Sequence, residues 1–397
     1  MSLIKKYIED QYIQNLKKYK YEGKDNSIYY KYIISPICDK ITSYLPKWLL
    51  PNTITVMGWF LNFLSVILTI YYGGWKGNDY LPSWVCYLGS INYSLYIYLD
   101  AIDGKQARRL KASSPLGVLF DHGCDACTSF FITIIGGTFF YYNNIYQYLL
   151  LFIPLTLTFF LNFIEEYYTG VLDLPIINGV EEGSIYVSFV FFLSGYCGSS
   201  FYNKKYNFFN KYDLKISELN GIAVFVGSML HCIKCFYDIL KKTEKNKVGQ
   251  IFISSFIYVL FILSLLSVVT FNNSVIVKEY PKLLILTFGF QIAKIYSIMQ
   301  VSQILKCPLD LCRPIFLIPL IALLIHSTIY YIIQYSLFVS IDTLIIIILI
   351  VNCISWIHYV YYCSEEICEI LNINRFIPGK RYESRPTFEE SQKLREK

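Results

Sequence analysis

Charged side chains are scarce in this chain. Lys, Arg, Asp and Glu make up only 16% of its 397 residues, and 55% of the residues are hydrophobic. A soluble domain usually carries about 25% charged residues. The mean hydropathy of +0.42 points the same way. The composition therefore excludes an ordinary soluble domain and predicts a membrane protein. Its net charge of +6 then reflects basic segments at the membrane surface rather than a nucleic-acid partner.

Two further features are rare or missing. Residues 1–30 lack an uninterrupted apolar core, so we expect no cleavable signal peptide, and the first span would direct insertion. Histidine occurs only 4 times. His231, His326 and His358 are isolated in apolar segments and are interpreted as packing residues. His122 is different because it lies in a charged stretch.

Apolar segments long enough to cross a bilayer, about 20 residues, occur ten times. They cover residues 52–72, 82–101, 116–141, 145–166, 184–199, 219–239, 250–271, 281–303, 314–335 and 341–364. The predicted fold class is an all-α integral membrane protein with about ten transmembrane helices. In addition, residues 29–49 mix Ile, Tyr, Trp and Lys, which is typical of an amphipathic helix lying in the membrane interface. Pro36 and Pro46 are expected to break or bend it.

The short basic segments predict the orientation. With ten spans, the Lys-rich residues 1–47, the segments after the second and sixth spans, and the tail all fall on one side, so both termini are expected in the cytosol. The loop after the fifth span does not fit this rule, because the number of preceding spans places it on the side of the membrane opposite the cytosol. Its lysines are Lys204, Lys205, Lys211 and Lys215. We interpret the loop as an exception to the rule; the alternative is a miscounted span.

Most of the unusual charge gathers in residues 98–127. Asp100 and Asp103 are three apart, and Asp121 and Asp125 are four apart, so each pair shares one face of a helix. The polar stretch GKQARRLKASSPLG between the pairs indicates the end of one helix, a short turn and the start of another. Helices joined by so short a turn must be neighbours. The two aspartate pairs are therefore expected to face each other near the cytosolic boundary.

Four converging carboxylates repel one another unless a cation lies between them. Oxygen ligands favour Mg²⁺, Mn²⁺ or Ca²⁺ over zinc, and four aspartates suffice for two bridged metals, an arrangement suited to phosphoryl displacement. The alternative is that the aspartates form ion pairs with basic residues of the same stretch. These are Lys105, Arg108, Arg109 and Lys111. Ionisable residues in or beside spans are costly and functional by default, which favours the metal site.

Small residues within the stretch leave room for a ligand. Gly104, Ala107 and Gly117 permit a close approach to the backbone. Arg108, one helical turn from Gly104, can hold a pyrophosphate. Metals, small residues and an arginine together indicate a substrate that contains a diphosphate.

The pattern Asp100-x2-Asp103-Gly104-x2-Ala107-Arg108-x8-Gly117-x3-Asp121-x3-Asp125 resembles, at every fixed position, the signature of the CDP-alcohol phosphotransferase family. The wider stretch DGKQARR…SSPLG…LFDHGCD is similar to that of the eukaryotic choline/ethanolamine phosphotransferases. So are LLPNTIT at 49–55 and EEYYTGVLDLPIINGVEEG at 165–183. The likeness covers at least residues 20–185.

This resemblance implies transfer of phosphocholine or phosphoethanolamine from CDP-choline or CDP-ethanolamine to diacylglycerol, with release of CMP. It implies an enzyme of the endoplasmic reticulum or the Golgi, with its active site facing the cytosol and a homodimeric assembly. The implied divisions are a cytosolic segment with the interfacial helix (1–50), a catalytic region (51–199), additional transmembrane helices for dimerisation or lipid contact (200–365), and a cytosolic tail (366–397).

The resemblance also implies roles for individual residues. Asp100, Asp103, Asp121 and Asp125 would hold two Mg²⁺ ions, with Mn²⁺ as the alternative. The substrate-binding residues would be Asn52, which meets the CDP-alcohol, and Gly104, Ala107, Arg108 and Gly117. His122 would be the general base that activates the lipid hydroxyl, with Asp125 as its rival.

One position departs from the group's pattern. Val118 stands one helical turn before His122, where related enzymes usually carry a glutamate. Either His122 is not the base, or another acid supplies the contact; Glu165, Glu166 and Glu182 are candidates by charge alone. The choice between choline and ethanolamine stays open, and dual specificity is our central expectation. The alternative functions are a CDP-diacylglycerol-dependent synthase of the same family and, in a different class, a divalent-cation transporter.

Overall fold

A computed structural model describes residues 7–21, 23–77, 80–174, 176, 178–208, 212–244, 247–271, 273–333 and 339–376. Helices dominate these residues. They are α1 (Ile13–Lys18), α2 (Ser35–Tyr44), α3 (Pro51–Gly73), α4 (Ser83–Leu110), α5 (Pro115–Phe139), α6 (Ile145–Thr169), α7 (Glu181–Tyr202), α8 (Ile216–Lys242), α9 (Val248–Phe271), α10 (Val275–Glu279), α11 (Pro281–Leu305), α12 (Pro314–Ile333) and α13 (Ile341–Leu371). A 3₁₀ turn at Asp10–Tyr12 precedes α1, and a π-helical turn at Tyr30–Ile34 precedes α2. The predicted all-α integral membrane fold is confirmed.

Each of the ten predicted spans forms a helix. Within the described part of the chain, 9 helices are long and apolar enough to cross a membrane. The tenth, α4, is 28 residues long but carries Ser, Asn and Tyr along its length and charges in its last turns. Its polar groups are used in packing, since Asn92 Nδ2 donates to Ser65 Oγ (3.0 Å) on α3. The helix α4 therefore lies among other helices rather than facing lipid all round.

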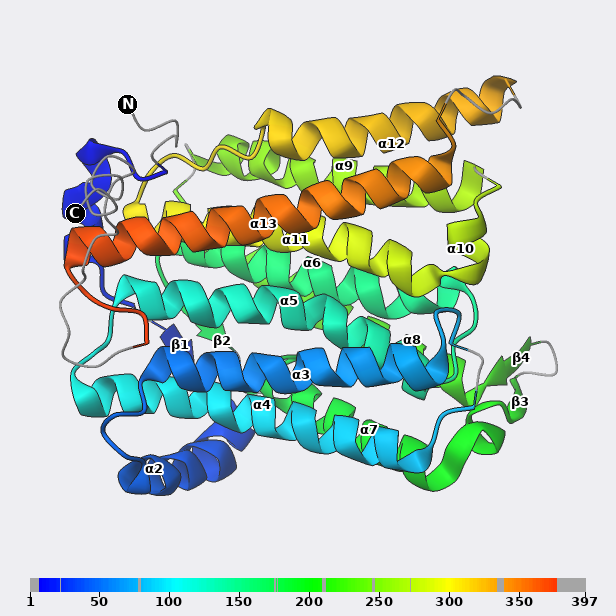
Figure 1. Ribbon diagram of the computed structural model, residues 1–397, viewed down its shortest axis with the longest axis horizontal. Helices are drawn as coiled ribbons and strands as arrows, with labels where there is room; N and C mark the ends of the chain where they lie inside the picture. Colours follow the sequence, from blue (N-terminus) through cyan, green and yellow to red (C-terminus); the bar gives the residue numbers. More distant parts are fainter. Residues whose placement is uncertain are drawn as a thin grey trace, which may run out of the picture.

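The long helices run along a common direction and form one bundle (Figure 1). The central helix is α11, the most deeply buried of the candidate spans, which packs against α5, α6 and α13. On one side α3 packs against α4 and α5, and α4 packs against α7; on the other, α8 packs against α6, and α12 against α9. The predicted division at residue 200 stays a prediction. In space, α11, which follows residue 200 in the chain, packs directly against α5 and α6, which precede residue 200.

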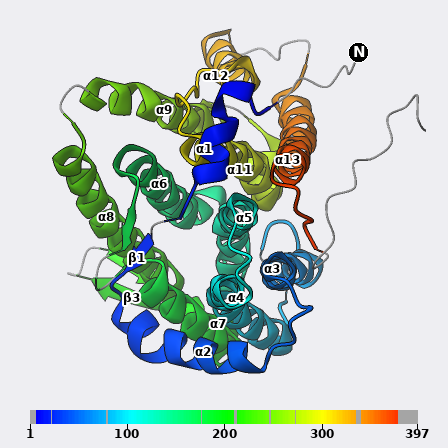
Figure 2. The ribbon, with the colours of Figure 1, turned by 90° about the vertical axis from the view of Figure 1, so that its left-hand side faces the viewer.

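The helix α2 lies across the bundle rather than along it. Figure 2 shows α2 lengthwise where α3, α5 and α13 are seen end-on. Pro36 lies in the first turn of α2, directly after the π-helical turn Tyr30–Ile34, and α2 ends before Pro46 because Leu45 is extended. The helical backbone runs without interruption from residue 28 to Tyr44, so Pro36 marks no helix end, whereas the expected end at Pro46 is confirmed. The orientation of α2 is the one expected of an interfacial helix.

The basic end of α4 holds α2 in place. Lys105 Nζ pairs with Asp39 Oδ1 at 2.8 Å. The Arg109 guanidinium donates to the carbonyl oxygens of Thr42 (2.6 Å), Ser43 (3.2 Å) and Leu45 (2.8 Å). A helix leaves its last carbonyls without partners, so Arg109 caps the C-terminus of α2.

Two small sheets mark opposite ends of the bundle (Figure 1). At the end that also holds α1, α2 and the turn between α4 and α5, β1 (Gly23–Asp25) pairs in parallel with β2 (Leu172–Leu174). At the other end, β3 (Lys205–Phe208) and β4 (Tyr212–Lys215) form an antiparallel hairpin. Most of the lysine-rich loop lies in this hairpin, so the loop is at the end of the bundle opposite α2, as helix parity predicts; the side of the membrane that it faces stays a prediction. The predicted tail extends past residue 376, and its residues 377–397 lie outside the described part of the chain.

Candidate metal and substrate site

The turn between α4 and α5 positions the charged residues. The helix α4 continues to Leu110, beyond the predicted span limit of 101, because its last turns are held by α2. It ends where Lys111 takes the left-handed conformation (φ 54°), and α5 begins at Pro115. The Ser114 side chain caps α5 by accepting a hydrogen bond from the Gly117 N–H (3.3 Å). The connection is short, as predicted.

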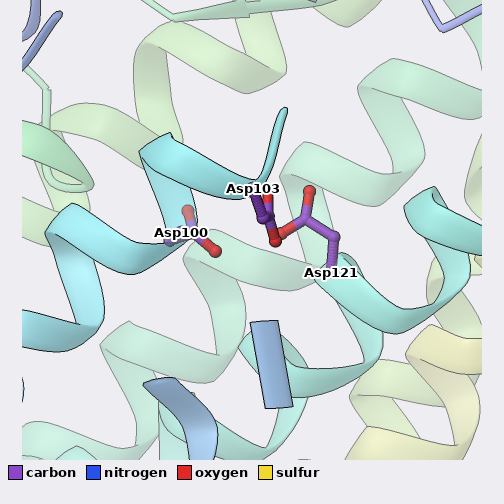
Figure 3. A group of neighbouring side chains, drawn as sticks. All are labelled: Asp100, Asp103 and Asp121. Atoms are coloured by element: carbon purple, nitrogen blue, oxygen red, sulfur yellow. The ribbon is translucent and has the colours of Figure 1, made fainter. Parts of the chain in front are cut away.

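Three of the four predicted metal ligands come together. One carboxylate oxygen each from Asp100, Asp103 and Asp121 lies within 4.8 Å of the others. Figure 3 shows these carboxylates at the end of α4 and the start of α5. Oδ1 of Asp100 and Oδ1 of Asp121 are buried and have no hydrogen-bond partner among the described residues. Buried anionic oxygens without partners are costly, so this donor set fits a divalent cation.

The competing ion-pair interpretation is not supported. Lys105 turns to Asp39, and Arg109 turns to the end of α2. Arg108 is exposed and, in the described part of the chain, has no ion pair with the three clustered aspartates; the same holds for Lys111. Among the described residues, these four basic side chains therefore do not balance the charge of the cluster, which could hold a divalent ion.

Asp125, the fourth predicted ligand, is not a member of the three-carboxylate group. Its Oδ1 accepts a hydrogen bond from the Tyr96 hydroxyl. In the same way, the Thr55 hydroxyl donates to Oδ2 of Asp103. Sequence reasoning missed Tyr96 and Thr55, since neither belongs to the aspartate spacing; the signal for Thr55 was its place in the LLPNTIT motif. The role of Asp125 as a ligand stays a prediction.

His122 lies beside the cluster. Its ring is buried (9% exposed), and Nε2 is 4.0 Å from Oδ2 of Asp121. Nδ1 is 2.7 Å from Oε1 of Gln300 on α11 and 3.7 Å from Oε2 of Glu166 on α6. Side chains from α11 and α6 therefore lie against the imidazole, whereas Val118 has no polar group with which to bond to it.

Of the three candidate acids, only Glu166 contacts His122. Oε1 of Glu165 pairs with Lys242 Nζ at 3.2 Å. Oε1 of Glu182 accepts a hydrogen bond from Ser27 Oγ (2.7 Å). The other three histidines bond elsewhere: His231 to Asn162, His326 to the Val339 carbonyl oxygen, and His358 to Tyr7. His231 and His326 are buried, as expected of packing residues, whereas His358 is exposed.

The N-terminal segment also reaches the site. The pairing of β1 with β2 carries the preceding residues across this end of the bundle (Figure 2). The Tyr21 ring meets the His122 ring edge-to-face, with centroids 5.8 Å apart. Desolvation of its hydroxyl, together with the nearby carboxylates of Glu166 and Asp121, raises the pKa of Tyr21. The phenol therefore stays neutral beside the imidazole.

The predicted substrate-binding residues fall into two neighbouring groups. A Cβ at Gly117 would lie 3.7 Å from Oδ1 of Asn52, so the starts of α3 and α5 meet there. Nδ2 of Asn52 donates to the Arg375 carbonyl oxygen at 3.0 Å. A Cβ at Gly104 would lie 3.5 Å from an Arg108 guanidinium nitrogen. Ala107, half-buried, lies on the same helix as this second group.

A helical membrane bundle with buried carboxylates at a helix end, and an imidazole beside them, is the arrangement expected of a membrane enzyme that could hold a divalent cation and act on a phosphate ester. Comparison with known proteins gives the family. The family model for CDP-alcohol phosphatidyltransferase matches residues 48–198. Ethanolaminephosphotransferase 1 of Homo sapiens is 31% identical over 333 residues, which cover 79% of this chain and 83% of the relative.

Two other relatives carry similar names. Cholinephosphotransferase 1 of Danio rerio is 28% identical over 324 residues, 77% of this chain and 80% of the relative. Choline/ethanolaminephosphotransferase 2 of Arabidopsis thaliana is 36% identical over 203 residues, 49% of this chain and 47% of the relative. The chain belongs to the CDP-alcohol phosphatidyltransferase family. The resemblance found in its motifs is confirmed, and the chain is an enzyme of this type.

Proposed function

We propose that this protein transfers phosphocholine or phosphoethanolamine from CDP-choline or CDP-ethanolamine to diacylglycerol and releases CMP. The observation that carries the proposal is the cluster of Asp100, Asp103 and Asp121 with His122 beside it. It is supported by the similarity, over more than three-quarters of the chain, to relatives named ethanolamine- and cholinephosphotransferase.

The clustered aspartates, with Asp125 as the fourth, would hold two Mg²⁺ ions, and Mn²⁺ is the alternative. When bound, such ions neutralise charge on the diphosphate and on the departing CMP. Their fit to this site rests on the two buried carboxylate oxygens that have no partner among the described residues.

The remaining work falls to the chain's own residues. The diacylglycerol hydroxyl oxygen attacks the phosphorus that bears the alcohol, and the bond from this phosphorus to the CMP oxygen breaks. The hydroxyl proton passes to Nε2 of His122, the ring nitrogen that faces Asp121. Arg108, exposed beside Gly104, neutralises the diphosphate, and Asn52 binds the CDP-alcohol next to Gly117.

The placement of the site suits a water-soluble donor and a lipid acceptor. The cluster lies at one end of the bundle, together with α2 and the basic end of α4. We propose that this end faces the cytosol, in the endoplasmic reticulum or the Golgi. Homodimerisation through residues 200–365 stays a prediction. A transport site would be expected nearer the middle of the bundle, so the position of the cluster does not favour a cation transporter.

The test uses the purified full-length protein in lipid nanodiscs with diacylglycerol and each labelled CDP-alcohol, with and without Mg²⁺. We expect labelled phospholipid and CMP with at least one donor, and no product after chelation. Asp121→Asn should abolish turnover, while Asp213→Asn, in the hairpin at the opposite end, should not. If neither CDP-alcohol gives CMP, the proposal is wrong. Product formed only from CDP-diacylglycerol and a free alcohol would identify the alternative synthase of the same family.

A further inference from the structure

We propose that Gln300, on α11, is a positioning residue that holds His122 in the tautomer needed of a general base. This inference rests on the proposed function. It assigns a role in the reaction to a residue about 100 positions beyond the 48–198 region matched by the family model. It also explains how His122 is held although Val118 replaces the expected glutamate.

The first step is the hydrogen bond itself. Oε1 of Gln300 lies 2.7 Å from Nδ1 of His122. An amide oxygen can only accept, so Nδ1 must carry the hydrogen and donate it. A neutral imidazole has one N–H, and the other nitrogen keeps a lone pair. Nε2 is therefore the proton acceptor.

The second step is the direction of the two ring nitrogens. Nε2 lies 4.0 Å from Oδ2 of Asp121, on the side of the carboxylate cluster, whereas Nδ1 points to α11. The nitrogen with the lone pair is therefore the one that faces the reacting groups. The opposite tautomer would place an N–H there and could not take a proton.

The third step is why Gln300, rather than Glu166, sets this arrangement. Oε2 of Glu166 is 3.7 Å from Nδ1, which is too long for a hydrogen bond. In the described part of the chain, Nε2 of Gln300 and Oε1 of Glu166 are buried without a hydrogen-bond partner, so Oε1 of Gln300, at 2.7 Å, is the acceptor in hydrogen-bond contact with Nδ1.

The fourth step is burial. Gln300 is 1% exposed on the most deeply buried span. A polar side chain in such a place is costly unless it is bonded. The ring is held further by Phe163, whose centroid is 5.8 Å from that of His122. Rotation of either side chain is therefore restricted, which keeps Nε2 aimed at the cluster.

The test compares two isosteric changes in the full-length enzyme. Gln300→Met keeps the size but removes the acceptor, and we expect kcat to fall about 10- to 100-fold, the usual cost of losing a residue that orients a functional histidine. KM for both substrates should stay within about twofold, because Gln300 is buried on α11 and is not one of the proposed substrate-binding residues. Gln300→Glu keeps an acceptor oxygen for Nδ1–H and should retain kcat to within about threefold. A purely structural role predicts the reverse order, since methionine suits a buried apolar helix better than a charged glutamate does.

A matched control lies on the same helix. Gln291 is also 1% exposed, but its Nε2 donates to the Phe316 carbonyl oxygen (3.1 Å), away from the site. Gln291→Met should change the melting temperature in detergent as much as Gln300→Met does, and leave kcat unchanged. In a His122→Ala background, Gln300→Met should cause no further loss.

Three results would overturn the inference: wild-type kcat in Gln300→Met, equal losses in Gln300→Met and Gln300→Glu, or an undiminished loss in the His122→Ala background. These failures are distinct from failure of the proposed function. An active wild-type enzyme with an unaffected Gln300→Met variant refutes only the positioning role. A wild-type enzyme that uses neither CDP-alcohol refutes the proposed function, and the positioning role falls with it.

Discussion

Replacing Asp121 by asparagine should stabilise the metal-free protein while it destroys activity. In the absence of an ion, the carboxylates of Asp100, Asp103 and Asp121 lie within 4.8 Å of one another, and two of their oxygens are buried without partners among the described residues. Asparagine keeps the shape of Asp121, removes one charge and supplies N–H donors to its neighbours. The repulsion and the unsatisfied acceptor are therefore both relieved.

The magnitude follows from the cost of an unsatisfied buried group, about 1–3 kcal/mol. With an unfolding entropy of about 2 cal/mol/K per residue, one kcal/mol shifts the melting temperature of a chain of this length by about 1 °C. Asp121→Asn should therefore melt about 1–4 °C above wild type in the presence of a chelator. Mg²⁺ at about 100 times its Kd should raise the wild-type melting temperature by about 3 °C, from a binding contribution of about 2.7 kcal/mol. The variant should lose this shift.

The assay is thermal unfolding of the purified protein in detergent, with chelator or with a series of Mg²⁺ concentrations. Asp213→Asn is the control for loss of one carboxylate outside the cluster, and it should behave as wild type in both conditions. A lower melting temperature for Asp121→Asn in chelator would refute the reasoning about repulsion. A wild-type Mg²⁺ shift in the variant would refute the metal site.

Other predictions separate roles within the site. His122→Ala should lower kcat by about 10²–10⁴-fold, the usual contribution of general-base catalysis, whereas near-wild-type turnover in this variant and a large loss in Asp125→Asn would make the aspartate the base. Tyr96→Phe removes the hydroxyl that donates to Asp125 and should raise the Mg²⁺ concentration for half-maximal activity about tenfold; an unchanged Mg²⁺ dependence would mean that Asp125 holds no metal. Arg108→Ala should raise KM for the CDP-alcohol, measured in steady-state assays, without lowering the melting temperature. Arg109→Ala should lower the melting temperature and leave KM for the CDP-alcohol unchanged, because it removes the cap of α2 at a cost of about 1–3 kcal/mol of folding stability. Equal melting temperatures for the two arginine variants would contradict these separate roles.

The positions of the helices could be predicted from the sequence because hydropathy is a local property. All ten predicted spans are helices, and most of their ends agree within a few residues. The largest difference is at the end of α4, which extends nine residues past the predicted membrane span of 82–101 into the polar stretch where a helix end was predicted. The helix continues to Leu110 because Lys105 and Arg109 are bound by α2, about 65 residues earlier in the chain.

The aspartate cluster was predictable for a similar reason. Spacings of three and four residues place side chains on one face of any helix, and a turn of four residues leaves its two helices few relative positions. The sequence therefore determined the helices, the turn and the facing carboxylates of Asp100, Asp103 and Asp121, since all of these follow from interactions between residues close together in the chain.

The tertiary structure alone decided how His122 is held. Its partner Gln300 is 178 residues away on α11, and Tyr21 reaches it from the N-terminal segment. Glutamine in an apolar helix carries no spacing signal, and nothing local to Val118 indicates which distant side chain replaces the missing glutamate. Such contacts depend on which buried faces of α5, α6 and α11 pack together, and packing is a property of the whole bundle rather than of any one segment.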